Sequence, residues 1–204
     1  MTATSRHQER TALMGMAIFV ASWAMLFAAL FFAYGLTRLR ATSWPPLDLP
    51  RLPLGLPGVA TLLLAASSWV LGRRRGAQGA AEQRRPELSK GERVEASLAG
   101  EASAARLLPG NPPLLAATLG ATFLVLQTTV WSHLYRAGLR PSAGAYASFF
   151  FALTVFHALH VLVGVGALGW LAARPRALSL RLWTIYWHMV GVIWGAMYLL
   201  VYVL

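Results

Sequence analysis

Five long apolar stretches dominate the chain, separated by polar or proline-rich residues. They cover residues 12–36, 54–72, 112–134, 143–173 and 180–204. A helix needs about 20 mostly apolar residues to cross a bilayer core roughly 30 Å thick. Prolines at positions 112 and 113 suit a first helical turn, whereas Pro57 weakens the second stretch. The pattern predicts an all-α membrane protein, a bundle of five transmembrane helices that forms one transmembrane domain over residues 1–204.

Composition supports lipid as the surrounding medium. Hydrophobic residues make up 57% of the chain, charged residues only 12%, and the mean hydropathy is +0.54. A soluble domain carries about 25% charged residues. All seven acidic residues lie outside the predicted spans. Because charges inside a membrane usually mark ion pathways, this weighs against a pump or proton antiporter. The lack of cysteine excludes disulfides, thiolate metal sites and cysteine nucleophiles.

The basic residues predict an orientation rather than a nucleic-acid partner. Eight of the 18 Lys and Arg residues lie in the segment 73–111, and the others flank the apolar stretches. The N-terminus, 73–111 and 174–181 together hold 13 of them, and the opposite side holds 5. The positive-inside rule therefore predicts a cytoplasmic N-terminus and an outside C-terminus. We expect 73–111 to be a charged cytoplasmic loop, either partly helical near 92–106 or partly disordered, and the proline-rich segment 42–57 to run extended over the outer face.

Three histidines in the predicted spans are candidates for chemistry. His157 and His160 are three residues apart, so they share one face of a helix, and His188 could approach from the fifth helix. Imidazole is a common haem and metal ligand. These histidines have no neighbouring carboxylate to orient them, which favours hydrogen bonding and packing over ligation.

Glycines and aromatic residues predict packing and anchoring. Residues 164–169 formally match GxGxxG, but they lie in an apolar helix, so Gly164 indicates close helix packing rather than nucleotide binding. Tyrosines and tryptophans near the predicted span ends are typical of an interfacial belt. These are Trp44, Trp131, Tyr135, Trp170, Trp183, Tyr186, Trp187 and Tyr202. Trp23, Trp69 and Trp194 lie deeper and are expected to pack between helices.

Several segments resemble subunit III of the haem–copper respiratory oxidases, in its short five-helix bacterial form. The fourth predicted helix carries phenylalanines, a threonine and an HxxHVxxG pattern that begins at His157. Residues 186–194, YWHMVGVIW, resemble the family's YWHFVDVVW. The first helix, the Trp44-Pro-Pro loop and Leu126-Gln127 of the third helix follow in the family's order, so the resemblance covers nearly the whole chain outside 73–110.

The chain departs from the family pattern at three membrane positions. The family usually has Glu at the position of Trp23, Glu near Val130 and Asp at the position of Gly191. This divergence puts any proton-linked role of those positions in question. It predicts a branch whose helices pack through apolar and aromatic contacts instead.

The resemblance implies a non-catalytic subunit of a terminal oxidase in the bacterial cytoplasmic membrane. The whole complex would reduce oxygen to water, coupled to proton translocation, with cytochrome c or quinol as donor. This chain would hold no cofactor, since haem and copper belong to partner subunits I and II. It would stabilise the core subunit and hold phospholipids. The residues expected at the lipid cleft or in helix packing are His157, His160, His188, Trp187, Gly164 and Trp23.

Three other functions stay open at the level of sequence. The chain could be an accessory subunit of a nitric oxide reductase or another respiratory complex. It could be a membrane haem-b electron carrier that uses His157, His160 and His188 as ligands. It could also transport a neutral solute, although the predicted spans supply no obvious polar cavity.

Overall fold

The computed structural model describes residues 3–47, 49–84, 111–174 and 176–203, and all regular structure in these ranges is helical. The elements are α1 (Ala3–Arg40), α2 (Gly55–Arg84), α4 (Pro112–Arg136), the 3-10 turn η2 (Pro141–Ala143), α5 (Ala145–Ala173), α6 (Ala177–Met197) and the π-helical turn η3 (Tyr198–Val203). Within these ranges, five helices are long and apolar enough to cross a membrane. The predicted all-α, five-helix membrane architecture is thus confirmed, while its orientation across the membrane stays a prediction.

Two helices extend further than their apolar stretches. The membrane-length part of α1 runs over Arg10–Arg40, beyond the predicted 12–36. Helix α2 continues to Arg84, so the first part of the segment predicted as a loop is helical. Alanine, glutamine, glutamate and arginine favour helix without needing lipid around them, which explains the extension. Residues 85–110, including the helix expected near 92–106, lie outside the described residues.

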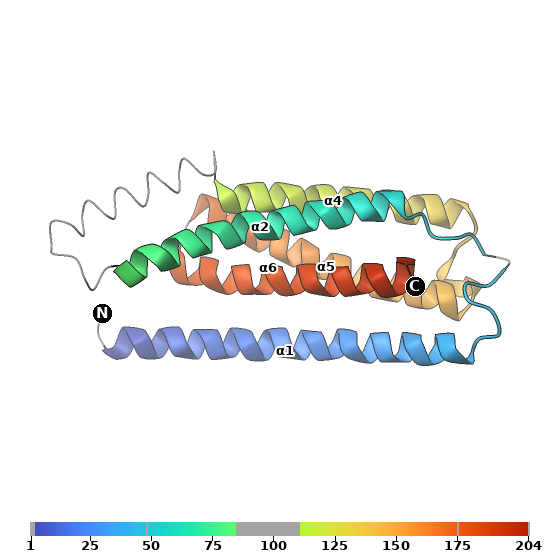
Figure 1. The fold of residues 1–204 in the computed structure, drawn as a ribbon, viewed down its shortest axis with the longest axis horizontal. Helices are drawn as coiled ribbons and strands as arrows, with labels where there is room; N and C mark the ends of the chain where they lie inside the picture. The colour runs from blue at the N-terminus through green and yellow to red at the C-terminus, as the bar shows by residue number, and fades with distance from the viewer. Residues whose placement is uncertain (1–2, 48, 85–110, 175, 204) are drawn as a thin grey trace.

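The helices run roughly along one common axis (Figure 1). Helix α2 packs against α4 and α6, α4 packs against α5, and α5 packs against α6. Helix α1 lies along one edge of the bundle and packs against α6 and α5 (Figure 1). In the most apolar 18-residue stretch of α1, only 6% is buried inside the bundle, whereas 33–44% of the corresponding stretch is buried in each of the other four spans. The bundle is therefore a four-helix body with α1 attached to one side.

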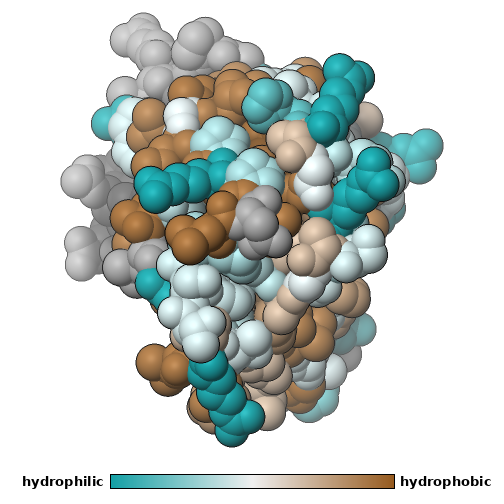
Figure 2. Space-filling view, turned by 90° about the vertical axis from the view of Figure 1, so that its right-hand side faces the viewer, coloured by the Kyte–Doolittle hydropathy of each residue, from teal (hydrophilic) through white to brown (hydrophobic). Residues whose placement is uncertain are grey.

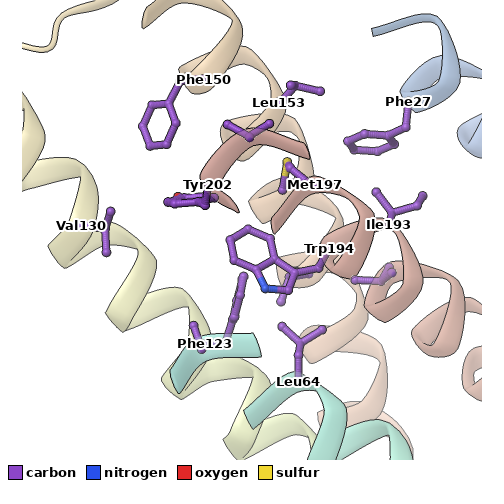
Figure 3. Packing of buried hydrophobic residues seen from close by; sticks show 14 of the residues in the cluster. Phe27, Leu64, Phe123, Val130, Phe150, Leu153, Ile193, Trp194, Met197 and Tyr202 are labelled. Atoms are coloured by element: carbon purple, nitrogen blue, oxygen red, sulfur yellow. The ribbon is translucent and has the colours of Figure 1, made fainter. Parts of the chain in front are cut away.

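Large side chains fill the centre of the bundle (Figure 3). Trp194 of α6 lies close to Phe123 of α4, with ring centroids 4.7 Å apart in an edge-on arrangement. Leu64 of α2 and Leu153 of α5 lie on opposite sides of Trp194 in this core, and each is almost fully buried. Edge-on aromatic pairs contribute about 0.5–1.5 kcal/mol beyond the area they bury.

The connections at one end of the bundle are held in place by hydrogen bonds and an aromatic contact. In the segment 41–54, the indole N–H of Trp44 donates to the Tyr34 hydroxyl at 3.1 Å, and its ring lies 5.1 Å from that of Tyr146. After α4, Gly138 has a φ of 96°, a left-handed conformation that favours glycine. The next residue, Leu139, is fully buried, and its N–H donates to the carbonyl of Leu134 at 3.0 Å. These contacts position the loops that follow α1 and α4.

Candidate functional site

Trp187 of α6 is the point at which four helices meet. Its side chain is fully buried, and its six-membered ring lies between two glycines. A Cβ atom added at Gly120 of α4 would lie 2.5 Å from this ring, and one added at Gly164 of α5 would lie 2.6 Å from it. The indole N–H donates to Oγ of Ser67 on α2 at 2.9 Å. Small residues let helices approach closely, and here they also make room for one large side chain.

His157 lies deep in the bundle among aromatic rings. It is 1% exposed, and its ring centroid is 5.1 Å from that of Trp194, 5.9 Å from Phe123 and 6.2 Å from Phe27. These rings come from α6, α4 and α1. Within the described part of the chain, its Nε2 atom has no hydrogen-bond partner. The surroundings of this imidazole are those of a core side chain.

His160 lies one turn further along the same face of α5. Its Nδ1 atom is hydrogen-bonded to the carbonyl oxygen of Phe156, and its ring contacts Trp23 and Phe27 of α1 edge-on. The hydroxyl of Tyr186 on α6 donates to the backbone oxygen of His160 at 3.0 Å. Both imidazoles are therefore covered by α1, through Trp23 and Phe27.

The third candidate histidine faces a different neighbour. His188 is half-buried, and its Cε1 atom would lie 3.7 Å from a Cβ added at Gly72 of α2. Because Trp187 points into the bundle, the roughly 100° step to the next helical residue turns His188 towards α2. Among the described residues, no group of three or more His, Asp or Glu side chains could hold a metal ion. The described fold therefore does not gather His157, His160 and His188 into one metal site.

Three tryptophans share one hydrogen-bonding arrangement. Trp187 donates to Ser67, Trp194 donates to Thr61 Oγ1 at 2.9 Å, and Trp131 donates to Thr154 Oγ1 at 3.0 Å. Each hydroxyl donates in turn to a carbonyl of its own helix, at 2.7 to 2.8 Å. The hydroxyl proton is thus used within the helix, while an oxygen lone pair accepts the indole of another helix. Polar groups in lipid need internal partners, and this arrangement satisfies both groups.

The structure also places the three positions where the related family usually has acids. Trp23 contacts the His160 ring, and Val130 is 1% exposed in the apolar core. A Cβ added at Gly191 would lie 3.1 Å from the Ser68 Oγ atom. That oxygen is buried without a hydrogen-bond partner in the described part of the chain. Each position therefore faces the interior of the bundle or another helix.

The predicted aromatic belt is wrong for three of its residues, and one tryptophan that was expected between helices is exposed. Tyr186 and Trp187 are fully buried and Tyr202 is 7% exposed, so they pack between helices rather than anchor the chain at an interface. Trp69, which was expected between helices, is 57% exposed, and the Arg73 guanidinium lies over its ring at 4.1 Å. Sequence position alone does not show which side of a helix a residue occupies.

Sequence reasoning missed several members of this core. Gly120 and Ser67 contact Trp187, and Phe27 and Phe123 contact His157. A glycine within an apolar helix was the available signal for Gly120, because such residues often mark close packing. The phenylalanines carry no such signal. As a whole, the arrangement joins five helices through aromatic and hydroxyl contacts.

No family model matches the chain. Sequence comparison nevertheless finds relatives over almost its whole length. The chain is 30% identical over 202 residues to the cytochrome c oxidase subunit 3 of Thermostichus vulcanus, which covers 94% of this chain and 86% of the relative. It is 29% identical over 199 residues to that of Synechocystis sp., covering 93% and 74% of the two chains. A probable cytochrome c oxidase subunit 3 of Nocardia farcinica is 28% identical over 197 residues, covering 92% and 85%. Together with the five membrane-length helices of the described residues, this similarity shows that the chain belongs to the cytochrome c oxidase subunit 3 family.

Proposed function

We propose that this chain is the non-catalytic third subunit of a bacterial terminal oxidase. The whole complex would reduce oxygen to water and couple this reaction to proton translocation across the cytoplasmic membrane. Similarity to subunit 3 over 94% of the chain is the observation that carries the proposal. Haem and copper would reside in partner subunits I and II.

The described contacts support a role in stabilising the core subunit. Trp187 fixes α2, α4, α5 and α6 relative to one another, because a single side chain contacts all of them. His157 and His160 bring α1 onto this body through Phe27 and Trp23. A bundle held in this way offers a rigid surface to a larger membrane partner.

Lipid contact is the second part of the proposed role. Large apolar side chains of α1 point away from the bundle, including Ile18, Met25 and Phe32, which are 68%, 73% and 68% exposed. Such side chains need lipid or another protein around them. Tryptophan and arginine pairs such as Trp170 with Arg176, 5.2 Å apart, suit the headgroup level. Phospholipids and oxidase subunits are therefore the proposed partners.

The decisive experiment isolates the native complex. The N-terminus would be tagged, native membranes would be solubilised gently, and the co-purifying subunits and visible spectrum would be recorded. We expect haem and copper to arrive with a large polytopic subunit and to disappear when that subunit is removed. If the chain instead co-purifies with the core subunit of a nitric oxide reductase, it is an accessory subunit of that complex and not of an oxidase. Haem retained on the isolated chain would overturn the non-catalytic role.

A further inference from the structure

The end of the bundle that carries segments 41–54 and 137–144 combines exposed arginines with an exposed leucine. Arg40, Arg51, Arg136 and Arg140 are all exposed there, and Asp48 is the one acidic residue in the two connecting segments. Figure 2 looks onto this end and shows hydrophilic side chains separated by hydrophobic ones. Leu47 is 94% exposed, which is unusual for a large apolar side chain next to water.

This surface is presented by a loop that is fixed to the helices. Trp44, three residues before Leu47, donates to the Tyr34 hydroxyl at 3.1 Å and stacks edge-on against Tyr146. The Arg140 guanidinium lies 5.3 Å from the centre of the Tyr135 ring. Leucine and arginine therefore occupy defined places at this end of the molecule.

The position of the surface favours a protein over a lipid as its occupant. The membrane-length part of α1 contains 31 residues, which at about 1.5 Å each is roughly 46 Å. A bilayer is about 40–45 Å thick including its headgroups. The segment after Arg40 runs across this end of the bundle, beyond the last turn of α1 (Figure 1), so it follows a helix that is already about as long as the whole bilayer is thick.

We propose that this end of the bundle docks the water-exposed part of another protein, one that has an apolar socket for Leu47 within an acidic rim. The arginines select the acidic rim, because complementary charges steer association and suppress wrong partners. Leu47 supplies an apolar contact of the kind found in the dehydrated core of interfaces. This surface is separate from the membrane-embedded contacts of the proposed oxidase function, so either inference can fail without the other.

The test uses photocrosslinking in the native membrane. Benzoylphenylalanine replaces Leu47 in the full chain, and a second strain carries it at Val125, a 63% exposed residue in the middle of α4 that serves as the reference within the membrane span. The crosslinked product is then mapped by mass spectrometry. We expect position 47 to crosslink to an acidic segment of another protein, and position 125 to crosslink to phospholipid.

Charge variants decide whether the contact depends on the arginines. The triple variant Arg40→Glu, Arg51→Glu, Arg140→Glu should reduce the crosslink about tenfold or more, because like charges facing each other across an interface repel. Arg176→Glu is the matched control, since Arg176 also covers an aromatic ring, 5.2 Å from its centre, but at the opposite end of the bundle. The triple Arg→Gln variant should give an intermediate loss, with each variant's membrane content measured as a check on folding. The proposal is overturned if position 47 crosslinks to phospholipid alone or forms no crosslink to protein. It is also overturned if charge reversal leaves the protein crosslink unchanged.

Discussion

The indole N–H of Trp187 donates to the hydroxyl oxygen of Ser67 at 2.9 Å, and both side chains are fully buried. The two residues are 120 positions apart and join α6 to α2. Ser67 in turn donates to the carbonyl of Leu64 at 2.7 Å. Every polar atom of this contact therefore has a partner in a medium that offers no water. A bundle without buried carboxylates in its described spans can be held in register by such neutral contacts.

Gly164→Ala should destabilise the protein, because its new methyl group would lie 2.6 Å from the Trp187 ring. Overpacking of this kind costs about 1–3 kcal/mol. Gly166→Ala is the matched control in the same helix, since a Cβ there would meet nothing within 4 Å. It should be neutral or stabilising by up to about 1 kcal/mol, as alanine favours helix over glycine. Thermal unfolding of the purified protein in detergent measures both, and equal midpoints for the two variants would contradict the packing role of Gly164.

The hydrogen bond between Trp187 and Ser67 can be measured by a double-mutant cycle. Trp187→Phe and Ser67→Ala should each destabilise the bundle, and the combination should cost less than their sum. We expect a coupling free energy of about 0.6–1.5 kcal/mol, the range for hydrogen bonds within membrane proteins. Additive effects in denaturant or thermal unfolding would mean that the contact contributes nothing beyond its two side chains.

His157→Phe should preserve both folding and the haem content of the complex. The ring lies among Phe27, Phe123 and Trp194, and its Nε2 atom has no partner in the described part of the chain. An aromatic replacement keeps a planar ring and removes a buried polar atom that has no partner, and this gain should offset the cost of a somewhat larger side chain. His157→Ala should instead cost about 2–5 kcal/mol because it leaves a cavity. Loss of the haem absorption bands in the His157→Phe complex would show that the imidazole is a ligand.

Gly191→Asp should be tolerated better than Gly191→Val. A Cβ at this position would lie 3.1 Å from Ser68 Oγ, so either residue requires a small shift of α2 against α6. A carboxyl group can accept a hydrogen bond from the Ser68 hydroxyl, which has no partner in the described fold. The advantage of aspartate should therefore vanish in a Ser68→Ala background. The readouts are the yield of assembled protein and its unfolding temperature. Equal values for Gly191→Asp and Gly191→Val would contradict the prediction.

Hydropathy predicted the number and type of the helices but not all their ends. The apolar stretches match membrane thickness, and each contains a helix. Residues such as Arg40 and Arg84 end their helices beyond the apolar part, because hydropathy reports the surrounding medium and not the hydrogen bonding of the backbone. Helix order around the bundle carries no signal in the chain, since it depends on packing between distant segments.

The same limit applies to the candidate site. The three-residue spacing placed His157 and His160 on one face of α5, and both are buried there. His188 could not be placed in the same way, because its neighbours depend on how α6 is rotated against α2. Trp187 was ambiguous for a related reason: a tryptophan near a predicted span end can anchor at the interface or fill a gap between helices. Only the facing glycines decide between the two.

The sparse burial of α1 has a consequence for biogenesis. With 6% of its apolar window buried, α1 gains little from its neighbours, so its retention in the membrane depends on its own hydropathy of 2.2. It can enter the bilayer as an autonomous segment as soon as it leaves the ribosome. The later spans have hydropathies from 1.4 to 2.0 and bury a third or more of their apolar windows. We therefore expect α1 to dock through Trp23 and Phe27 after the other helices have packed around Trp187.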